Sequence, residues 1–217
     1  MNVLGFDTST AATAVCVERA DGESFEYVPA VEELDGRPGH ASELLPRVAG
    51  LMEQAGLGWA DIGAIGVGVG PGAFTGLRIG VTTARSLALA RDLELRPVSS
   101  LRALAEGIEG PLRLPAIDAR RGEVFGALYE DRVERLEPAA RSPQDLATHA
   151  GGARAAGTGA LHFREALEAA GATVEPDGAL AHVVRALNVC RLARRVPARP
   201  PATVLPDYLR LPDAKPR

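Results

Sequence analysis

Lysine is almost absent from this 217-residue chain, in which Lys215 is the single lysine among 24 lysine and arginine residues. The phosphate-binding loop of P-loop ATPases requires a lysine between a glycine and a serine or threonine. Lys215 stands before Pro216 instead. The sequence therefore excludes this class of ATPase.

Long apolar runs and metal motifs are missing as well. No apolar run approaches the ~20 residues that cross a membrane, and the start of the chain is a strand pattern with an acidic end rather than a signal peptide. The four histidines lack metal-binding spacing, so no metal site is expected. Cys16 and Cys190 each lie in an apolar segment, as is typical of core residues in a reducing compartment. We expect a soluble, cytoplasmic protein without a membrane partner.

The charge balance limits the class of protein further. The formal net charge is −4 at pH 7, whereas proteins that bind nucleic acid over much of their surface are usually strongly basic. Any nucleic-acid contact must therefore be local or must come through a partner.

The chain contains a pattern of strands and helices that occurs twice. The first copy predicts strands over 2–7, 12–18, 24–28, 62–69 and 95–98, with helices over 42–55 (Ser42 as N-cap), over 74–91, and from Ser99 or Ser100 to Ile108. The second copy predicts strands over 113–118, 123–129 and 132–137, a helix over 143–150, a strand within 151–160, and helices over 161–171 and 180–195.

The two copies begin in the same way, 111 residues apart in the sequence. In each, a buried strand ends in an aspartate (Asp7 and Asp118), a polar turn follows, and the next strand ends in a glutamate. This predicts an internal duplication of a β-β-β-α-β-α unit in an α/β protein. We predict an N-terminal lobe over 1–110 and a smaller, degenerate C-terminal lobe over 111–217. The alternative is that both copies are generic strand-turn-strand units.

A glycine-rich segment over 66–80 follows a predicted strand and opens a helix. Such a loop can bind an anion with its free N–H groups, but the GxGxxG pattern of dinucleotide sites is absent. Tight backbone packing is the other interpretation of the glycines. Asp7 leaves two interpretations open in the same way: a metal–phosphate ligand or a turn cap. The candidate anion or nucleotide loop comprises Asp7, Gly70, Gly72 and Thr75.

The helix predicted over 74–91 has no polar face. One stripe is apolar and faces the predicted sheet, and the opposite stripe is small or apolar too. A helix of this kind is normally covered on both sides. The second cover is either another helix of this chain or a partner, and we expect a protein interface on the outer stripe. With two residues of the preceding helix, the candidate interface comprises Leu45, Met52, Ile79, Thr83, Ser86, Leu87 and Ala90.

Six motifs along the chain resemble the TsaB (YeaZ) family. They are VLGFDTSTAATAVCV at the start, HASELLP at 40–46, the loop and helix at 66–81, VSSL at 98–101, AIDARRGE at 116–123 and PDYLR at 206–210. They occur in order along almost the whole chain, and residues 139–200 match only loosely.

The resemblance implies the actin-like ATPase (ASKHA) fold in two duplicated lobes, each with a mixed sheet and helices. It also implies a role beside TsaD, the catalytic paralogue, and TsaE, an ATPase, in transferring a threonylcarbamoyl group to the tRNA adenosine beside the anticodon. TsaD carries a His-x-x-x-His metal motif that this chain lacks, so the resemblance implies a noncatalytic partner subunit. It further implies an interface on the two N-lobe helices, a homodimer of the isolated chain, and ATP use by the complex rather than by this chain alone.

The alternative is a small ATPase or kinase of the same fold. Such an enzyme needs a second phosphate loop, and the matching turn here, Asp118 to Gly122, has two bulky arginines where a backbone must approach phosphate. A second open question is the basic stretch Arg185, Arg191, Arg194, Arg195 and Arg199. It is either a solvated helix face or a contact with tRNA phosphates in the complex.

Overall fold

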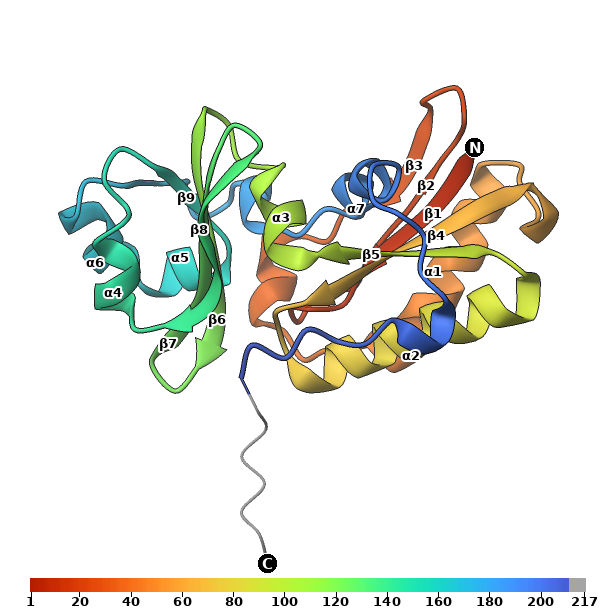
Figure 1. Ribbon diagram of the computed structural model, residues 1–217, viewed down its shortest axis with the longest axis horizontal. Helices are drawn as coiled ribbons and strands as arrows, with labels where there is room; N and C mark the ends of the chain where they lie inside the picture. The colour runs from red at the N-terminus through yellow and green to blue at the C-terminus, as the bar shows by residue number, and fades with distance from the viewer. Residues whose placement is uncertain (211–217) are drawn as a thin grey trace, which may run out of the picture.

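Two five-stranded mixed sheets lie side by side in the computed structural model, which describes residues 1–210 (Figure 1). The first sheet has the order β3-β2-β1-β4-β5. Its strands are β1 (Asn2–Asp7), β2 (Ala14–Glu18), β3 (Ser24–Tyr27), β4 (Ile62–Gly70) and β5 (Glu94–Ser99). The helices of this half are α1 (His40–Gln54), α2 (Phe74–Arg91) and α3 (Ser100–Ala105), with short 3-10 turns η1 (Val31–Asp35) and η2 (Trp59–Asp61).

The second sheet has the order β10-β9-β6-β7-β8. Its strands are β6 (Leu112–Arg120), β7 (Glu123–Glu130), β8 (Val133–Arg141), β9 (Arg154–Ala156) and β10 (Thr173–Val174). The helices of this half are α4 (Pro143–Ala147), α5 (Thr158–His162), α6 (Arg164–Ala169) and α7 (Ala186–Ala193), with 3-10 turns η3 (Leu180–His182) and η4 (Pro201–Thr203).

The two sheets have the same topology, which confirms the predicted duplication. In each, the first three strands form an antiparallel meander, and the fourth and fifth strands run parallel to the first. Counted from its own first strand, each sheet has the order 3-2-1-4-5. Generic strand-turn-strand units would not reproduce all five positions.

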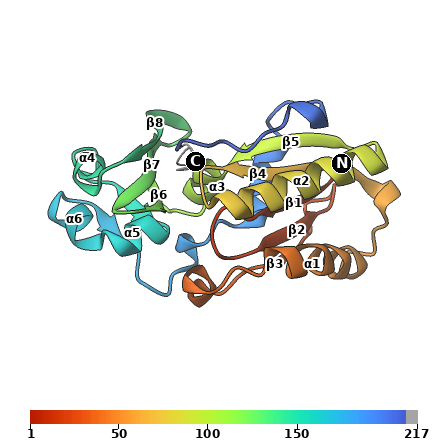
Figure 2. The ribbon, with the colours of Figure 1, turned by 90° about the horizontal axis from the view of Figure 1, so that it is seen from below.

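Alternating side chains of β1 divide the first lobe into two layers. Val3 belongs to the hydrophobic cluster shared with α3 and α7, whereas Leu4 and Phe6 belong to the cluster shared with α1 and α2. Successive residues of a strand point to opposite faces of a sheet, so each face is covered by a different pair of helices. Figure 2 shows α1 and α2 next to each other on their face of the sheet.

The helix α3 lies between the two sheets, and α7 lies on the first one. α3 packs against β4 and β5 of the first sheet and against β6 and β7 of the second, and α7 follows the second sheet but packs against β1, β2 and β4 of the first (Figure 1). The predicted C-terminal lobe, 111–217, therefore does not pack as one unit. Its part from α7 to η4 lies on the first lobe, because the apolar face of α7 covers an otherwise exposed sheet face.

Ion pairs fix α7 on the first sheet. Arg185 pairs with Glu26 of β3, whose side chain is 6% exposed. Arg194 pairs with Glu18 of β2 at 2.7 Å, and its guanidinium also donates to the carbonyl oxygens of Met1 and Arg19. These contacts leave the end of the second repeat attached to the first lobe.

Several predicted element bounds are wrong. α1 begins at His40 rather than at Ser42, whose hydroxyl donates to the carbonyl of Gly39 inside the first turn. The predicted helix over 161–171 is two short helices divided at Phe163, and the one over 180–195 is η3 followed by α7. The α2 bounds and the Ser99 cap of α3, which accepts from the Arg102 N–H, are confirmed.

No helix among residues 1–210 is both long and apolar enough to span a membrane.

Candidate functional site

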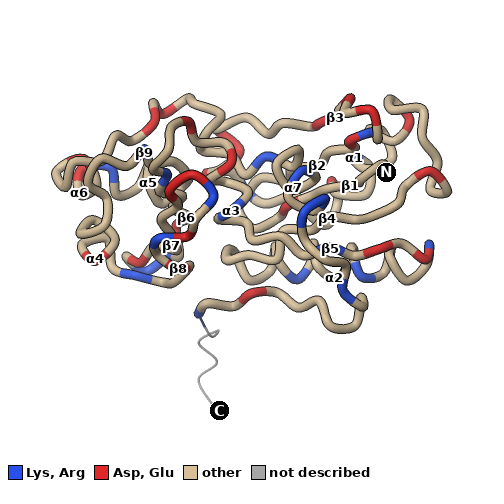
Figure 3. The backbone as a smooth tube through the Cα atoms, turned by 45° about the horizontal axis from the view of Figure 1, so that its top comes forward, with Lys and Arg blue, Asp and Glu red and all other residues tan. Residues whose placement is uncertain are grey.

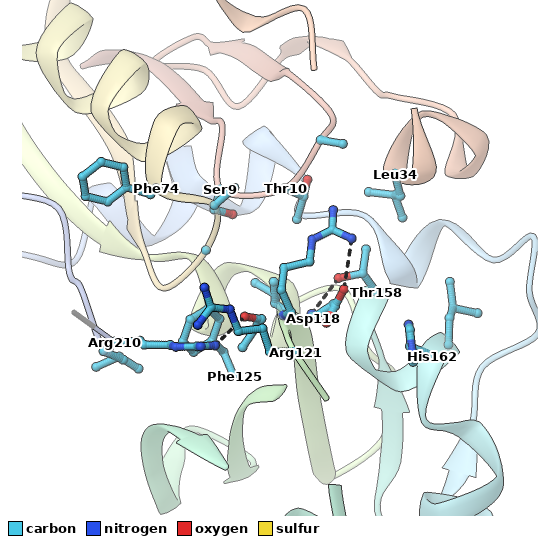
Figure 4. A pocket seen from close by; sticks show the side chains of 18 of the residues that line it. Ser9, Thr10, Leu34, Phe74, Asp118, Arg121, Phe125, Thr158, His162 and Arg210 are labelled. Carbon is cyan, nitrogen blue, oxygen red and sulfur yellow. Dashed lines mark hydrogen bonds and ion pairs between the residues drawn. The ribbon is translucent and has the colours of Figure 1, made fainter. Parts of the chain in front are cut away.

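A cleft of about 500 Å³ lies between the two lobes. Its walls are the β1–β2 turn, η1 and the start of α2 on one side, and the β6–β7 turn and α5 on the other. Figure 4 shows side chains of Ser9, Thr10 and Leu34 across the cleft from Asp118 and Thr158. An enzyme of the actin-like fold would need a phosphate loop at each of these two turns, after β1 and after β6. The residues of both turns therefore bear on whether the cleft could bind a nucleotide.

Asp7 ends β1 and organises the first turn. Its Oδ1 accepts hydrogen bonds from the Ser9 N–H at 2.7 Å and the Ser9 hydroxyl at 2.6 Å, and its Oδ2 accepts from the Ser100 hydroxyl at 2.6 Å. Burial raises the pKa of the Asp7 carboxyl, and the bonds from Ser100 and Ser9 oppose that shift. The geometry supports the turn-cap interpretation, because both carboxylate oxygens already have protein partners.

Glycines of the 66–80 segment let the first turn lie directly on α2. A Cβ at Gly72 would overlap the carbonyl oxygen of Ser9, and one at Gly76 would overlap that of Thr8. The Ala73 N–H, which could have faced an anion, donates to the Ser9 carbonyl at 2.7 Å. The tight-packing interpretation of these glycines therefore has direct structural support.

The predicted anion-loop residues are only partly brought together. Asp7 and the Gly70 N–H both bond to the Ser100 hydroxyl, the latter at 3.2 Å. Gly72 lies under Ser9, while Thr75 is exposed on the first turn of α2. The four residues surround a packed junction of β1, β4 and α3 rather than a common cavity.

The second turn carries the two arginines predicted to crowd a nucleotide. Arg120 and Arg121 both adopt positive φ angles, 65° and 56°, and Gly122 follows with a φ of 76°. The Arg120 N–H donates to Asp118 Oδ1 at 2.8 Å, and the Asp118 N–H donates to Thr158 Oγ1 at 3.0 Å. Two long side chains thus stand at the mouth of the cleft, where a phosphate loop would present glycine or a small residue.

The segment at 206–210, which carries the PDYLR motif, joins the lobes along one wall of the cleft. The Asp207 N–H donates to the Val69 carbonyl of β4 at 2.7 Å, and the Tyr208 ring lies 5.0 Å from that of Phe74 on α2. Arg210 pairs with Glu123 of β7 at 2.9 Å. The motif therefore has a clear role in holding the lobes together, which sequence reasoning did not assign to it.

The second candidate site is the outer face of α1 and α2. Leu45 is 53% exposed, and Ser86 and Ala90 are also exposed. Ile79, Thr83 and Leu87 are half-buried at the flank of this face. Met52 is only 5% exposed and belongs to the core between α1 and the sheet, so it offers a partner little surface.

Sequence reasoning missed the most exposed large apolar side chain of this face. Leu89 of α2 is 67% exposed, beside Ser86 and Ala90. Its spacing of three residues from Ser86 was the available signal, because residues three apart share a helix face. The exposed residues of α2 between Thr82 and Ala90 are small or apolar, while Arg85 is half-buried among them and Arg78 is exposed one turn before Thr82. The exposed residues Leu45, Thr82, Ser86, Leu89 and Ala90 are called the α1/α2 face below.

Residues 1–210 contain no cluster of three or more His, Cys, Asp or Glu side chains placed to hold a metal ion. His40 is buried, with its Nδ1 2.8 Å from the Thr13 hydroxyl, and burial lowers its pKa. Ser42 is exposed two residues away and faces the carbonyl of Gly39. The residues His40 to Glu43 therefore do not form a nucleophile–base pair.

Comparison with known proteins agrees with this architecture. The family model described as TsaD: tRNA N6-adenosine threonylcarbamoyltransferase matches residues 36–215. Two relatives are named tRNA threonylcarbamoyladenosine biosynthesis protein TsaB. That of Bacillus subtilis is 35% identical over 140 residues, covering 63% of this chain and 58% of the relative. That of Escherichia coli is 41% identical over 134 residues, covering 60% and 55%. The chain thus spans a little over half the length of these relatives.

A solved structure, YeaZ from Pseudomonas aeruginosa, matches with a TM-score of 0.79 and 28% identity, covering 95% of this chain and 99% of that one. The duplicated mixed sheets, the helix α3 between them and the cleft between the lobes define the actin-like ATPase (ASKHA) fold. Within it, this chain belongs to the family described by the threonylcarbamoyltransferase model, and to its TsaB (YeaZ) group.

Proposed function

We propose that this chain is a noncatalytic partner subunit in the biosynthesis of threonylcarbamoyladenosine in tRNA. Its partner is the catalytic relative, TsaD, which it binds and activates through the α1/α2 face. The observation that carries the proposal is the outer face of two neighbouring helices, with small and apolar exposed residues, in a family whose named members belong to threonylcarbamoyladenosine biosynthesis in tRNA.

The chemistry of the α1/α2 face favours a protein partner. Leu45 and Leu89 are exposed without cover from residues 1–210, and the side chains around Ser86 and Ala90 are small. Small residues let a second helix approach closely, and exposed leucines supply apolar area on association. Two helices from each partner could pack as a bundle across such an interface.

The runner-up function, a small ATPase or kinase, lacks support in the cleft. The first turn is buried under the start of α2, with Ser9 only 1% exposed. The second turn presents Arg120 and Arg121 instead of a flexible small-residue loop. ATP use accordingly belongs, in this proposal, to TsaE within the complex, and no cofactor is assigned to this chain alone.

The remaining partners follow from the family resemblance. TsaE joins the complex, tRNA is contacted through the assembly, and the isolated chain forms a homodimer through the same α1/α2 face. A cytoplasmic location fits a protein that acts on tRNA. Each of these points stays a prediction.

Charge placed on the α1/α2 face tests the proposal. We expect Ser86→Arg and Ala90→Glu to fold with cooperative melts, because both positions are exposed in the monomer. Their affinity for TsaD should fall about 100-fold or more, since an unpaired charge buried at an interface costs several kcal/mol. Affinity is measured by titration calorimetry or co-purification.

Ala169→Glu on α6 is the matched control, since Ala169 is equally exposed and lies in the other lobe. It should leave binding unchanged. Normal binding of TsaD by a folded Ala90→Glu variant would place the interface elsewhere.

A further inference from the structure

Basic residues without acidic neighbours are concentrated near the end of the chain. Residues 178–206 contain five arginines and no aspartate or glutamate, although the whole chain has 28 acidic residues and a net charge of −4. Figure 3 shows basic positions along α7 and the chain that follows it. The five are Arg185, Arg191, Arg194, Arg195 and Arg199.

The structure divides these arginines into two groups. Arg185 and Arg194 are half-buried and bind Glu26 and Glu18, so they hold α7 on the first sheet. Arg191, Arg195 and Arg199 are exposed, and no side-chain hydrogen bond or ion pair joins them to another residue within 1–210. These three residues are called the arginine row below.

The backbone under the arginine row is fixed. The Arg199 N–H donates to the Leu95 carbonyl of β5 at 2.8 Å, so the chain runs along the open edge of the first sheet. The Arg96 guanidinium donates to the carbonyls of Ala193 and Val196 at 3.0 and 2.8 Å, on either side of Arg195. Arg191 lies in the last turn of α7, and Arg195 lies in the turn that follows, where its N–H donates to the Leu192 carbonyl at 2.9 Å.

The nearest acidic residue on the β5 edge is already neutralised. Glu94 pairs with Arg96 at 2.5 Å, and Arg96 itself is held by the end of α7. The arginine row therefore presents three uncompensated positive charges on a rigid support. Guanidinium groups suit phosphate, because their donors match its oxygens and they are only weakly hydrated.

We propose that the arginine row binds RNA backbone phosphates when this chain is assembled with its catalytic relative, and this inference rests on the proposed function. After Arg199 the chain continues into η4, which packs on α2, so the Arg199 end of the row lies next to the helix that carries the α1/α2 face, whereas Arg191 lies on α7 at the opposite face of the sheet. A tRNA held by the partner could extend along the β5 edge. Because the net charge of the chain is negative, the contact is local and adds to binding by the complex.

The test compares two triple variants of the same net charge. Arg191→Gln/Arg195→Gln/Arg199→Gln removes the row, and Arg37→Gln/Arg132→Gln/Arg135→Gln removes three exposed arginines elsewhere. Affinity of each assembled complex for a tRNA transcript is measured between 50 and 300 mM KCl, with assembly checked by sizing chromatography. Each phosphate contact contributes roughly 0.7–0.9 to the slope of log affinity against log salt.

We expect the row variant to assemble normally and to lose about 2 units of that slope, with roughly tenfold weaker tRNA binding at low salt. The control variant should match the wild type. Equal slopes for the row variant and the wild type would overturn the inference while leaving the proposed function intact. Weaker assembly with unchanged RNA binding would overturn it too, since the row would then contact protein.

If the wild-type chain fails to bind its catalytic relative, the proposed function fails separately. The same salt titration is then made on the lone chain with the transcript. A salt dependence of RNA affinity that is present in the wild-type chain and reduced in the row variant would support the RNA contact. The same salt dependence in both proteins would overturn it.

Discussion

Asp7 ends β1 with a buried carboxylate that accepts three hydrogen bonds, two from Ser9 and one from Ser100. Ser9 belongs to the first turn, and Ser100 opens α3, which packs between the lobes. One side chain thus links the end of a strand to its own turn and to the helix that reaches the second lobe. Asp7 of the DTST motif therefore has both carboxylate oxygens engaged within the fold, while Ser9 and Thr10 of the same motif line the cleft.

Removing the charge of Asp7 should change how stability depends on pH. Burial raises the folded-state pKa above its unfolded value, so the folded protein holds this proton more tightly than the unfolded chain. Asp7 therefore contributes stability that is present below the unfolded pKa of about 4 and is lost as pH rises through the folded pKa. The Asp7→Asn variant has no ionisable group at this position, so its stability does not fall with pH for this reason.

We expect the melting temperature of Asp7→Asn relative to the wild type to increase as pH rises above about 4 and to level off once pH exceeds the folded pKa of Asp7. The amide disturbs the bond to Ser100, but that offset does not vary with pH. Calorimetric melts of both proteins across this range measure the effect. A difference that is constant or decreases with pH would contradict the assigned direction of the Asp7 shift.

At the scale of elements, α2 lies against the first turn because of its glycines. Gly76 faces the Thr8 carbonyl, and the Thr8 hydroxyl donates to the Gly76 carbonyl at 2.8 Å. Gly80 faces the same hydroxyl one helical turn later. Glycine lowers the helix propensity at these two interior positions, but it allows close contact between α2 and the β1–β2 turn.

Gly76→Ala should lower the free energy of unfolding by about 1–3 kcal/mol, because the new methyl group overlaps backbone that cannot rotate away. Gly50→Ala is the matched control within α1, where a Cβ meets nothing within 4 Å. It should raise stability by up to ~1 kcal/mol through helix propensity. Both are measured by urea denaturation, and equal effects of the two substitutions would show that α2 packs differently.

Much of the element pattern could be predicted from sequence, and the misses have physical causes. The α2 bounds were correct because its apolar period is long and begins after a proline and glycine. α1 begins before Ser42 because Gly39 provides the N-cap position without a side-chain bond. The position of α7 on the first sheet was missed because it depends on pairing between Glu26 and Arg185, 159 residues apart.

At the scale of the whole molecule, the duplication predicted from Asp7 and Asp118 was correct, but α7 and η4 pack on the first lobe rather than within the predicted C-terminal lobe. α3 packs against both sheets and shares with α7 one hydrophobic cluster that includes Val3, Leu104 and Ile117. The segment ending in Arg210 adds a second connection. Local patterns along the chain do not encode which sheet a returning helix will cover.

The candidate sites were predictable to different extents. Helix periodicity predicted the exposed positions Leu45, Ser86 and Ala90 of the α1/α2 face, whereas Met52 belongs to the core and Leu89 was overlooked. The role of this face as a partner interface stays a prediction. The glycine-rich loop remained ambiguous, because backbone N–H groups serve an anion and a packed turn equally well. The hydrogen bond from the Ala73 N–H to the Ser9 carbonyl, which only the structure shows, favours the packed turn.

The central claim is that this chain activates a catalytic relative without catalysing the transfer itself. The most direct measurement is reconstituted transfer of the threonylcarbamoyl group to tRNA by purified TsaD and TsaE, with and without this chain. We predict no transfer by this chain alone, and a rate that rises roughly tenfold or more when the wild-type chain is added but not when Ala90→Glu is added. Transfer by this chain alone, or an equal rate with and without it, would contradict the account.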